Sequence, residues 1–107
     1  MDDQRVRRLA ENEAIARQVN EQVEKLGKRW NAPGEPLEIL CECSLAECTQ
    51  RLHVSLAEYA AVREHDTRFL IADGHMVEGI ERQVGEAGDA IVVEKLGPGR
   101  DVAIETA

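Results

Sequence analysis

The first third of the chain has the spacing of hydrophobic and polar residues that is typical of one long α-helix, from Asp2 to about Trp30. This segment contains no proline and a single glycine, Gly27. Acidic residues near its beginning and basic residues near its end complement the helix dipole. Pro33-Gly34 then ends the pattern. We therefore expect an N-terminal helix that occupies residues 1–32.

The hydrophobic stripe of this helix is thin, and its members follow one another at alternating spacings of three and four residues. They are Leu9, Asn12, Ala16, Val19, Val23, Leu26 and Trp30. This is a heptad pattern with one asparagine, a residue that often determines register in coiled coils. Three interpretations stay open. The stripe packs on the rest of the protein, or the helix is a frayed arm, or the stripe binds a partner helix or a second copy through Val19, Val23, Leu26 and Trp30.

The pattern after the helix predicts a small unit of short antiparallel strands with one internal helix, over residues 37–96. Residues 37–43 and 49–54 have the composition of two strands of a hairpin, and residues 68–72 of a short buried strand. The capping box Ser55-Leu56-Ala57-Glu58 predicts where the internal helix begins. The expected fold class is therefore α+β, with a long N-terminal helix followed by this smaller unit.

The end of the chain is less clearly patterned. Residues 77–84 fit either a short helix or an alternating strand. We favour a strand, because residues 85–89 are typical of a loop that precedes the strongly β-prone Ile91-Val92-Val93. Residues 97–107 begin with Gly-Pro-Gly, and we expect them to form a flexible tail.

The composition limits the core that this chain can build. At 107 residues it has room for one domain, and it contains one Trp, one Tyr and one Phe. The core must therefore consist of Val, Ile, Leu and Ala. If the first helix projects, roughly seventy residues remain for that core, and domains of this size often depend on a disulfide or a metal.

All three cysteines lie within eight residues, at Cys41, Cys43 and Cys48. We call residues 41–48 the knuckle. An odd number of cysteines argues against a disulfide framework. Three thiolates in one tight turn are typical of a structural zinc site, which takes four thiolate or imidazole ligands in a closed tetrahedron. The sequence therefore predicts that a zinc ion stabilises residues 37–96.

The fourth ligand must come from elsewhere, and the candidates are His53, His65 and His75 or an acidic side chain. His53 is near the knuckle in sequence, but a strand leading away from the knuckle would require its ring to point back. His75 lies in a glycine turn at the end of an expected strand, where it could reach the cysteines across the fold. The spacing favours His75 and leaves His53 as the alternative.

Six short motifs are distributed over roughly residues 10–96. They are Asn12-Glu13, Arg17-Gln18-Val19-Asn20-Glu21-Gln22-Val23, Cys41-Glu42-Cys43 with Cys48-Thr49, Leu56-Ala57-Glu58-Tyr59-Ala60-Ala61-Val62-Arg63, Arg68-Phe69-Leu70-Ile71-Ala72-Asp73-Gly74-His75 and Val92-Val93-Glu94-Lys95. Together they resemble a family of small uncharacterised proteins found mainly in actinobacteria and related high-GC bacteria. The resemblance implies a histidine ligand at the Gly-His turn, which supports His75, and it implies no activity. Asp73 and Met76 depart from the family's version of this turn.

The charge is distributed unevenly along the chain. Residues 1–36 carry seven basic and seven acidic side chains, so the net charge of −8 lies entirely in residues 37–107. Such a surface repels a phosphate backbone, which disfavours nucleic acid as a partner. The chain has no apolar signal segment and no run long enough to span a bilayer, so we expect a cytoplasmic location and no membrane contact.

These observations favour a small zinc-stabilised protein-interaction or regulatory module without enzymatic activity. Three cysteines and a histidine fill the shell of a zinc ion and leave no position for water or substrate. A zinc hydrolase would need Glu42, Glu47 or Glu78 as its base, but no hydrolase motif accompanies them and we expect them to be surface charges. The main alternative is a thiol/zinc redox switch at Cys41 and Cys43. Zinc-knuckle nucleic-acid binding and zinc hydrolysis are weaker alternatives.

Overall fold

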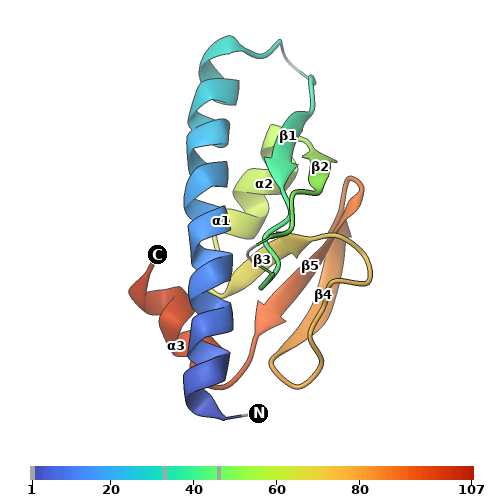
Figure 1. The fold of residues 1–107 in the computed structure, drawn as a ribbon. Helices are drawn as coiled ribbons and strands as arrows, with labels where there is room; N and C mark the ends of the chain where they lie inside the picture. The colour runs from blue at the N-terminus through green and yellow to red at the C-terminus, as the bar shows by residue number, and fades with distance from the viewer. Residues whose placement is uncertain (1, 33, 46) are drawn as a thin grey trace.

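The computed structural model describes residues 2–32, 34–45 and 47–107. Its elements are α1 (Asp3–Trp30), β1 (Leu37–Leu40), β2 (Arg51–Val54), α2 (Leu56–Arg63), β3 (Arg68–Ile71), β4 (Glu81–Ala87), β5 (Ala90–Lys95) and α3 (Pro98–Glu105). The long helix α1 runs along one side, with β1 and β2 beside its C-terminal half and α3 beside its N-terminal half (Figure 1). This confirms the expected α+β class, with a long N-terminal helix, short antiparallel strands and an internal helix.

Helix α1 packs on the rest of the chain through a face of small and polar residues. It begins at the cap residue Asp2, whose side chain accepts a hydrogen bond from the Arg5 amide at 2.9 Å. Its buried residues are Val6, Ala10, Glu13, Ala14, Arg17, Asn20 and Gly27. By contrast, Val19, Leu26 and Trp30 are 44%, 59% and 73% exposed. The interpretation that the heptad stripe packs on the rest of the protein holds only in part, because Val23 packs against the core and Asn12 contacts Ser44. The interpretation of α1 as a frayed arm is wrong.

Gly27 allows α1 to approach the hairpin closely. A Cβ atom at this position would overlap Cδ2 of Leu37, at the beginning of β1. A glycine inside a helix costs roughly 0.5–1 kcal/mol relative to alanine. Because Gly27 has no side chain, α1 and β1 can contact each other at this position.

Strands β1 and β2 form the expected hairpin, with Leu37 opposite Val54 and Leu40 opposite Arg51. Both are shorter than predicted, because residues 41–43 and 49–50 lie outside the strands. Their burial alternates along the chain, because successive side chains of a strand point to opposite faces. The capping box is also confirmed. The Ser55 hydroxyl accepts from the Glu58 amide at 3.0 Å, and the Glu58 carboxylate accepts from the Ser55 amide at 2.8 Å.

The remaining strands form one antiparallel sheet in the order β3-β5-β4. The preference for a strand at residues 77–84 is correct only in part, because β4 begins at Glu81. The expected loop at residues 85–89 is wrong over its first three residues, which belong to β4 beyond an irregularity between Gln83 and Gly85. The turn is confined to residues 88–89. There Gly88 has a φ of +55°, and a Cβ atom would overlap the carbonyl of His53 on β2.

The expected flexible tail at residues 97–107 is a helix over most of its length. Pro98 occupies the first turn of α3, a position that suits proline because its missing amide needs no partner there. Val102 and Ala103 are buried. The buried guanidinium of Arg17 on α1 donates to the Ala103 carbonyl at 2.9 Å and to the Thr106 hydroxyl at 2.9 Å, which attaches the end of α3 to α1.

A buried ionic cluster joins α1 to the sheet. Lys95 Nζ on β5 lies 2.6 Å from Glu13 Oε1 on α1 and 3.2 Å from Glu81 Oε2 on β4, and all three side chains are buried. The cluster combines two carboxylates with one ammonium group. Burial raises the pKa of Glu13 well above its usual range, although Lys95 opposes the shift. Glu13 therefore retains its proton to a higher pH in the folded protein than in the unfolded chain.

The change Glu13→Gln should make stability less sensitive to pH. The stabilising contribution of protonated Glu13 is complete below its ordinary pKa of 4.5 and falls as pH rises toward the raised value. Glutamine cannot lose that proton, so the variant should gain stability relative to wild type by up to about 1.4 kcal/mol per pH unit above pH 5. Urea unfolding between pH 5 and 8 measures this difference. Glu11→Gln, at an exposed position of the same helix, is the control, and parallel curves for all three proteins would contradict the prediction.

Candidate metal centre

The knuckle begins where β1 ends, and its first residues continue the extended backbone of that strand. The Cys41 amide donates to the Gln50 carbonyl at 2.9 Å, which extends the pairing of the hairpin by one residue. The Glu42 amide then donates to the Leu70 carbonyl on β3 at 2.8 Å. The knuckle is therefore attached to both sheets by backbone hydrogen bonds.

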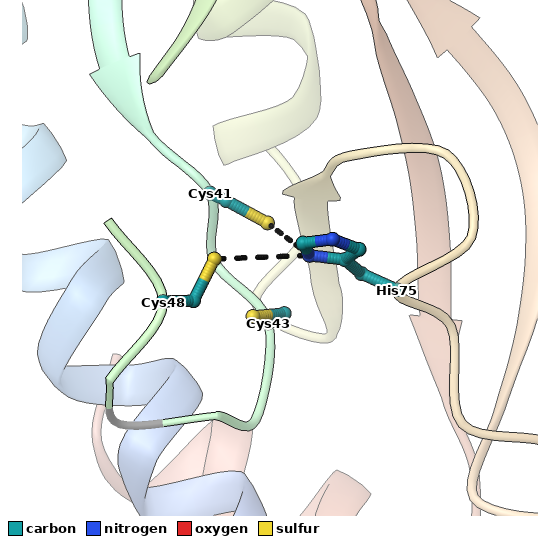
Figure 2. Close-up of side chains that lie close together, drawn as sticks. All are labelled: Cys41, Cys43, Cys48 and His75. Carbon is teal, nitrogen blue, oxygen red and sulfur yellow. Dashed lines mark hydrogen bonds between the residues drawn. The ribbon is translucent and has the colours of Figure 1, made fainter. Parts of the chain in front are cut away.

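The turn after β3 brings His75 to the three cysteines (Figure 2). Gly74 has a φ of +87°, and the His75 amide donates to the Ala72 carbonyl at 3.1 Å, which closes the turn. His75 Nδ1 lies 3.4 Å from Cys41 Sγ and 3.7 Å from Cys48 Sγ. One ligand atom from each of these three residues and from Cys43 lies within 4.8 Å of every other.

These distances fit a tetrahedral zinc ion. Zinc–sulfur bonds of about 2.3 Å and zinc–nitrogen bonds of about 2.0–2.1 Å at tetrahedral angles separate sulfur from nitrogen by about 3.6 Å. The two measured sulfur–nitrogen distances, 3.4 and 3.7 Å, lie on either side of that value. Three thiols and an imidazole are also the donors that zinc prefers in structural sites.

The protonation of the buried thiols depends on the charge beside them. Burial raises the pKa of Cys41, opposed by the Ala72 amide, which donates to Cys41 Sγ at 3.2 Å. Burial likewise raises the pKa of Cys43 to about 12. A cation among the three sulfurs would offset this burial and favour the thiolates. As free thiols they are weak nucleophiles at neutral pH, because the thiolate is the reactive form.

The other two histidines lie apart from this group. His53 is exposed on β2, where its Nδ1 lies 3.2 Å from Asp89 Oδ2 and its Nε2 lies 3.7 Å from Glu38 Oε2. His65 is exposed just beyond the end of α2. Among the described residues, the metal-ligand group contains neither of them. The strand direction explains this, because β2 leads His53 away from the knuckle.

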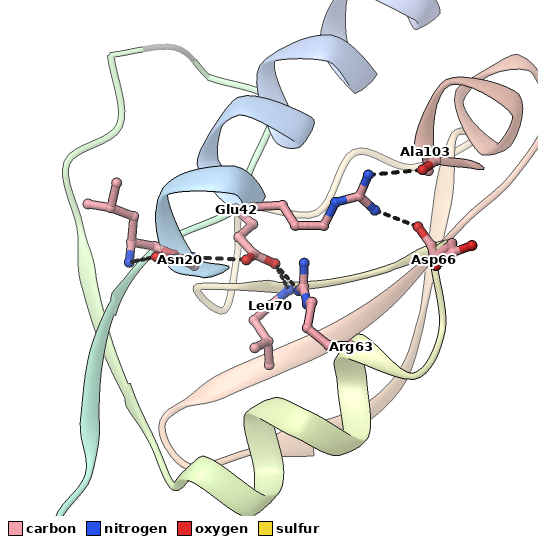
Figure 3. A network of polar contacts seen from close by, with 8 residues as sticks. Asn20, Glu42, Arg63, Asp66, Leu70 and Ala103 are labelled. Atoms are coloured by element: carbon pink, nitrogen blue, oxygen red, sulfur yellow. Dashed lines mark hydrogen bonds and ion pairs between the residues drawn. The ribbon is translucent and has the colours of Figure 1, made fainter. Parts of the chain in front are cut away.

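Glu42, between the first two cysteines, is a buried structural residue rather than a surface charge (Figure 3). Its carboxylate accepts hydrogen bonds from Arg63 Nη2 at 2.6 Å, from Asn20 Nδ2 at 2.9 Å and from the Leu70 amide at 2.9 Å. These donors occupy the carboxylate, so it is not available as a general base at the cysteine cluster. Glu47 and Glu78 are exposed, as expected.

Two asparagines of α1 hold the backbone of the knuckle region. Asn20 donates to the Leu40 carbonyl at 2.8 Å and accepts from the Leu40 amide at 2.8 Å. Asn12 donates to the Ser44 carbonyl at 3.0 Å. The asparagine of the heptad pattern thus contacts the knuckle of its own chain. The signal available in the sequence was the spacing of eight between Asn12 and Asn20, which places both near the same side of a helix.

No protein-family model matches this chain, and searches of the curated proteins and of the solved structures also find no match. The resemblance to the actinobacterial family stays a prediction. None of the described helices is long and apolar enough to cross a membrane.

Glu42→Ala should destabilise the protein strongly. The change leaves Arg63 without its carboxylate and removes the acceptor of Asn20, and breaking a buried ion pair typically costs about 3–5 kcal/mol. Urea unfolding at pH 7 with one equivalent of zinc measures the loss. Glu47→Ala removes an exposed carboxylate from the same knuckle and should stay within about 0.5 kcal/mol of wild type. Equal stabilities for the two variants would show that the Glu42 network is not needed.

Proposed function

We propose that the protein binds one zinc ion through Cys41, Cys43, Cys48 and His75, and that the ion has a structural role. The observation that supports this most directly is the position of the four ligand atoms, all within 4.8 Å of one another. They come from two segments separated by 26 residues, the knuckle and the turn after β3. Bound zinc would therefore connect the hairpin to the three-stranded sheet.

The chemistry of the ligands supports zinc over other common metals. Mg²⁺ and Ca²⁺ take oxygen ligands, whereas this group offers sulfur and nitrogen. Four ligands close the tetrahedron, which is the arrangement of structural zinc sites rather than of catalytic ones. The reactive chemistry of zinc needs an open position for water, so the same ligand set supports a non-enzymatic protein.

The segment that carries the cysteines has little regular structure of its own. Over the described residues 41–45 and 47–50 it forms no helix or strand. Such a segment gains most from a link across the fold, because ordering each backbone residue costs roughly 1–2 kcal/mol. Because this site forms only in the folded chain, the free energy of metal binding would add to the free energy of folding.

Beyond metal binding, we propose a protein-interaction or regulatory module that acts in the cytoplasm. The support is a closed site combined with large apolar side chains that remain exposed on α1. A reducing compartment suits three free cysteines. The acidic charge of residues 37–107 disfavours nucleic acid as the partner.

A thiol/zinc redox switch is the second candidate, and one observation favours it. Cys48 is only half-buried, whereas Cys41 and Cys43 are buried, so an oxidant could reach the cluster at Cys48. Oxidation of two thiols to a disulfide by one peroxide would yield two waters and remove two ligands. Hydrogen peroxide should then release zinc and lower the protein mass by two hydrogens. Zinc that stays bound under peroxide would rule out this candidate and leave the structural role intact.

Substituting a ligand should abolish zinc binding and weaken the fold. Native mass spectrometry of protein purified without added metal should show one zinc per wild-type chain and none in Cys48→Ser or His75→Ala. Loss of the ion should lower the free energy of unfolding by at least about 4 kcal/mol, the size typical of losing a metal. His53→Ala, which changes an exposed histidine outside the group, should keep both zinc and stability. A metal-free wild type that is as stable as the zinc-treated protein would overturn the proposal.

A further inference from the structure

An apolar groove lies between α1 and the knuckle. It has a volume of about 150 Å³, and its lining includes Ile15, Ala16, Val19, Leu40, Leu45 and Cys48. Two of the lining residues, Ile15 and Leu45, are 61% and 59% exposed. The walls of this groove belong to α1 and to the knuckle, which is attached to both sheets. The groove is therefore already formed and could bind an apolar side chain of another molecule.

The other end of the same face of α1 carries exposed side chains beside a second, more open hollow, which Leu26 and Trp30 line together with Leu37. Trp30 is 73% exposed and Leu26 is 59% exposed. The large exposed apolar residues of α1 are Ile15, Val19, Leu26 and Trp30. At about 100° per residue, these four lie within about 60° of one another around the helix. One face of α1 thus has an apolar groove at residues 15–19 and, toward its C-terminal end, the exposed indole of Trp30.

We propose that this face binds a second copy of the chain, with the two α1 helices antiparallel and Trp30 of each copy in the groove of the other. The inference rests on the proposed interaction role and names its partner. A two-fold axis beside residues 22–23 places Trp30 opposite Ile15 and Leu26 opposite Val19. Residues 15 and 30 are about 22 Å apart along the helix. Both groove contacts therefore form together, as an isologous dimer requires.

The distribution of charge supports pairing through α1. The net charge of −8 lies in residues 37–107, whereas residues 1–36 are neutral, so two copies repel each other least across α1. The antiparallel direction also brings the basic end of one helix, with Lys25 and Arg29, toward the end that carries Glu11 and the exposed Glu47 in the other copy. A parallel pair would place both basic ends together.

The single tryptophan reports directly on this contact, because Trp30 is the only one in the chain. Wild-type protein should elute as a dimer at high concentration, with Trp30 emission shifted to the blue relative to dilute, monomeric protein. Ile15→Asp and Val19→Asp change the groove and leave the tryptophan in place. Each should raise the dimer dissociation constant at least 10-fold and abolish the concentration-dependent shift.

Ile104→Asp is the matched control, since Ile104 is an apolar residue of α3 that is 50% exposed and lies off this face. It should dimerise like wild type. Two results would overturn the proposal. One is a wild-type protein that stays monomeric from nanomolar to 100 micromolar concentration, which would mean that a different protein binds this face. The other is a dimer whose dissociation constant does not change in Ile15→Asp and Val19→Asp. Native mass spectrometry counts zinc and chains separately. A monomer with one zinc would contradict the dimer alone, and a dimer without zinc would contradict the proposed zinc site alone.

Discussion

The carboxylate of Glu42 connects segments of the chain that are far apart in sequence. It accepts hydrogen bonds from Asn20 on α1, Arg63 on α2 and the backbone of Leu70 on β3, while its own backbone continues from β1. A buried carboxylate is costly unless it is paired and hydrogen-bonded, and here three donors meet that requirement. The position of the knuckle therefore depends on α1, α2 and β3 together. The contacts of the Glu42 side chain, on the other side of the backbone from the cysteines, therefore help to position Cys41 and Cys43.

This arrangement gives the knuckle two independent attachments. Extended backbone alternates its side chains, so Cys41 and Cys43 face His75 while Glu42 faces the core. The proposed zinc ion would link the knuckle to the turn after β3, and the carboxylate links it to β3 itself. The core holds the ligands in advance, which reduces the ordering that metal binding must bring about. It also explains how the knuckle, whose described residues form no helix or strand, keeps its three sulfur atoms within 4.8 Å of one another and of the His75 nitrogen.

The parts of the fold that follow local rules could be predicted from the sequence, and those that depend on distant partners could not. The capping box at Ser55, the hairpin and the turn that carries His75 each depend on neighbouring residues. The buried face of α1 depends on partners up to 89 positions away, as for Arg17 and Thr106. A charged residue in a helix usually faces water, so the pattern alone does not reveal that Glu13 and Arg17 are buried. The pattern Gly-Pro-Gly is typical of a break between elements and hides α3, although proline is also typical of a first helical turn.

The burial of polar side chains on α1 determines which apolar side chains of this helix remain available to other molecules. The helix buries Glu13, Arg17 and Asn20 in specific pairings and leaves Leu26 and Trp30 toward solvent. Polar pairs determine one packing of α1 against the core, because any other rotation would leave buried charges without partners. That constraint fixes which residues point outward. The polar network therefore keeps the exposed apolar residues of α1, such as Val19, Leu26 and Trp30, in one orientation on the surface.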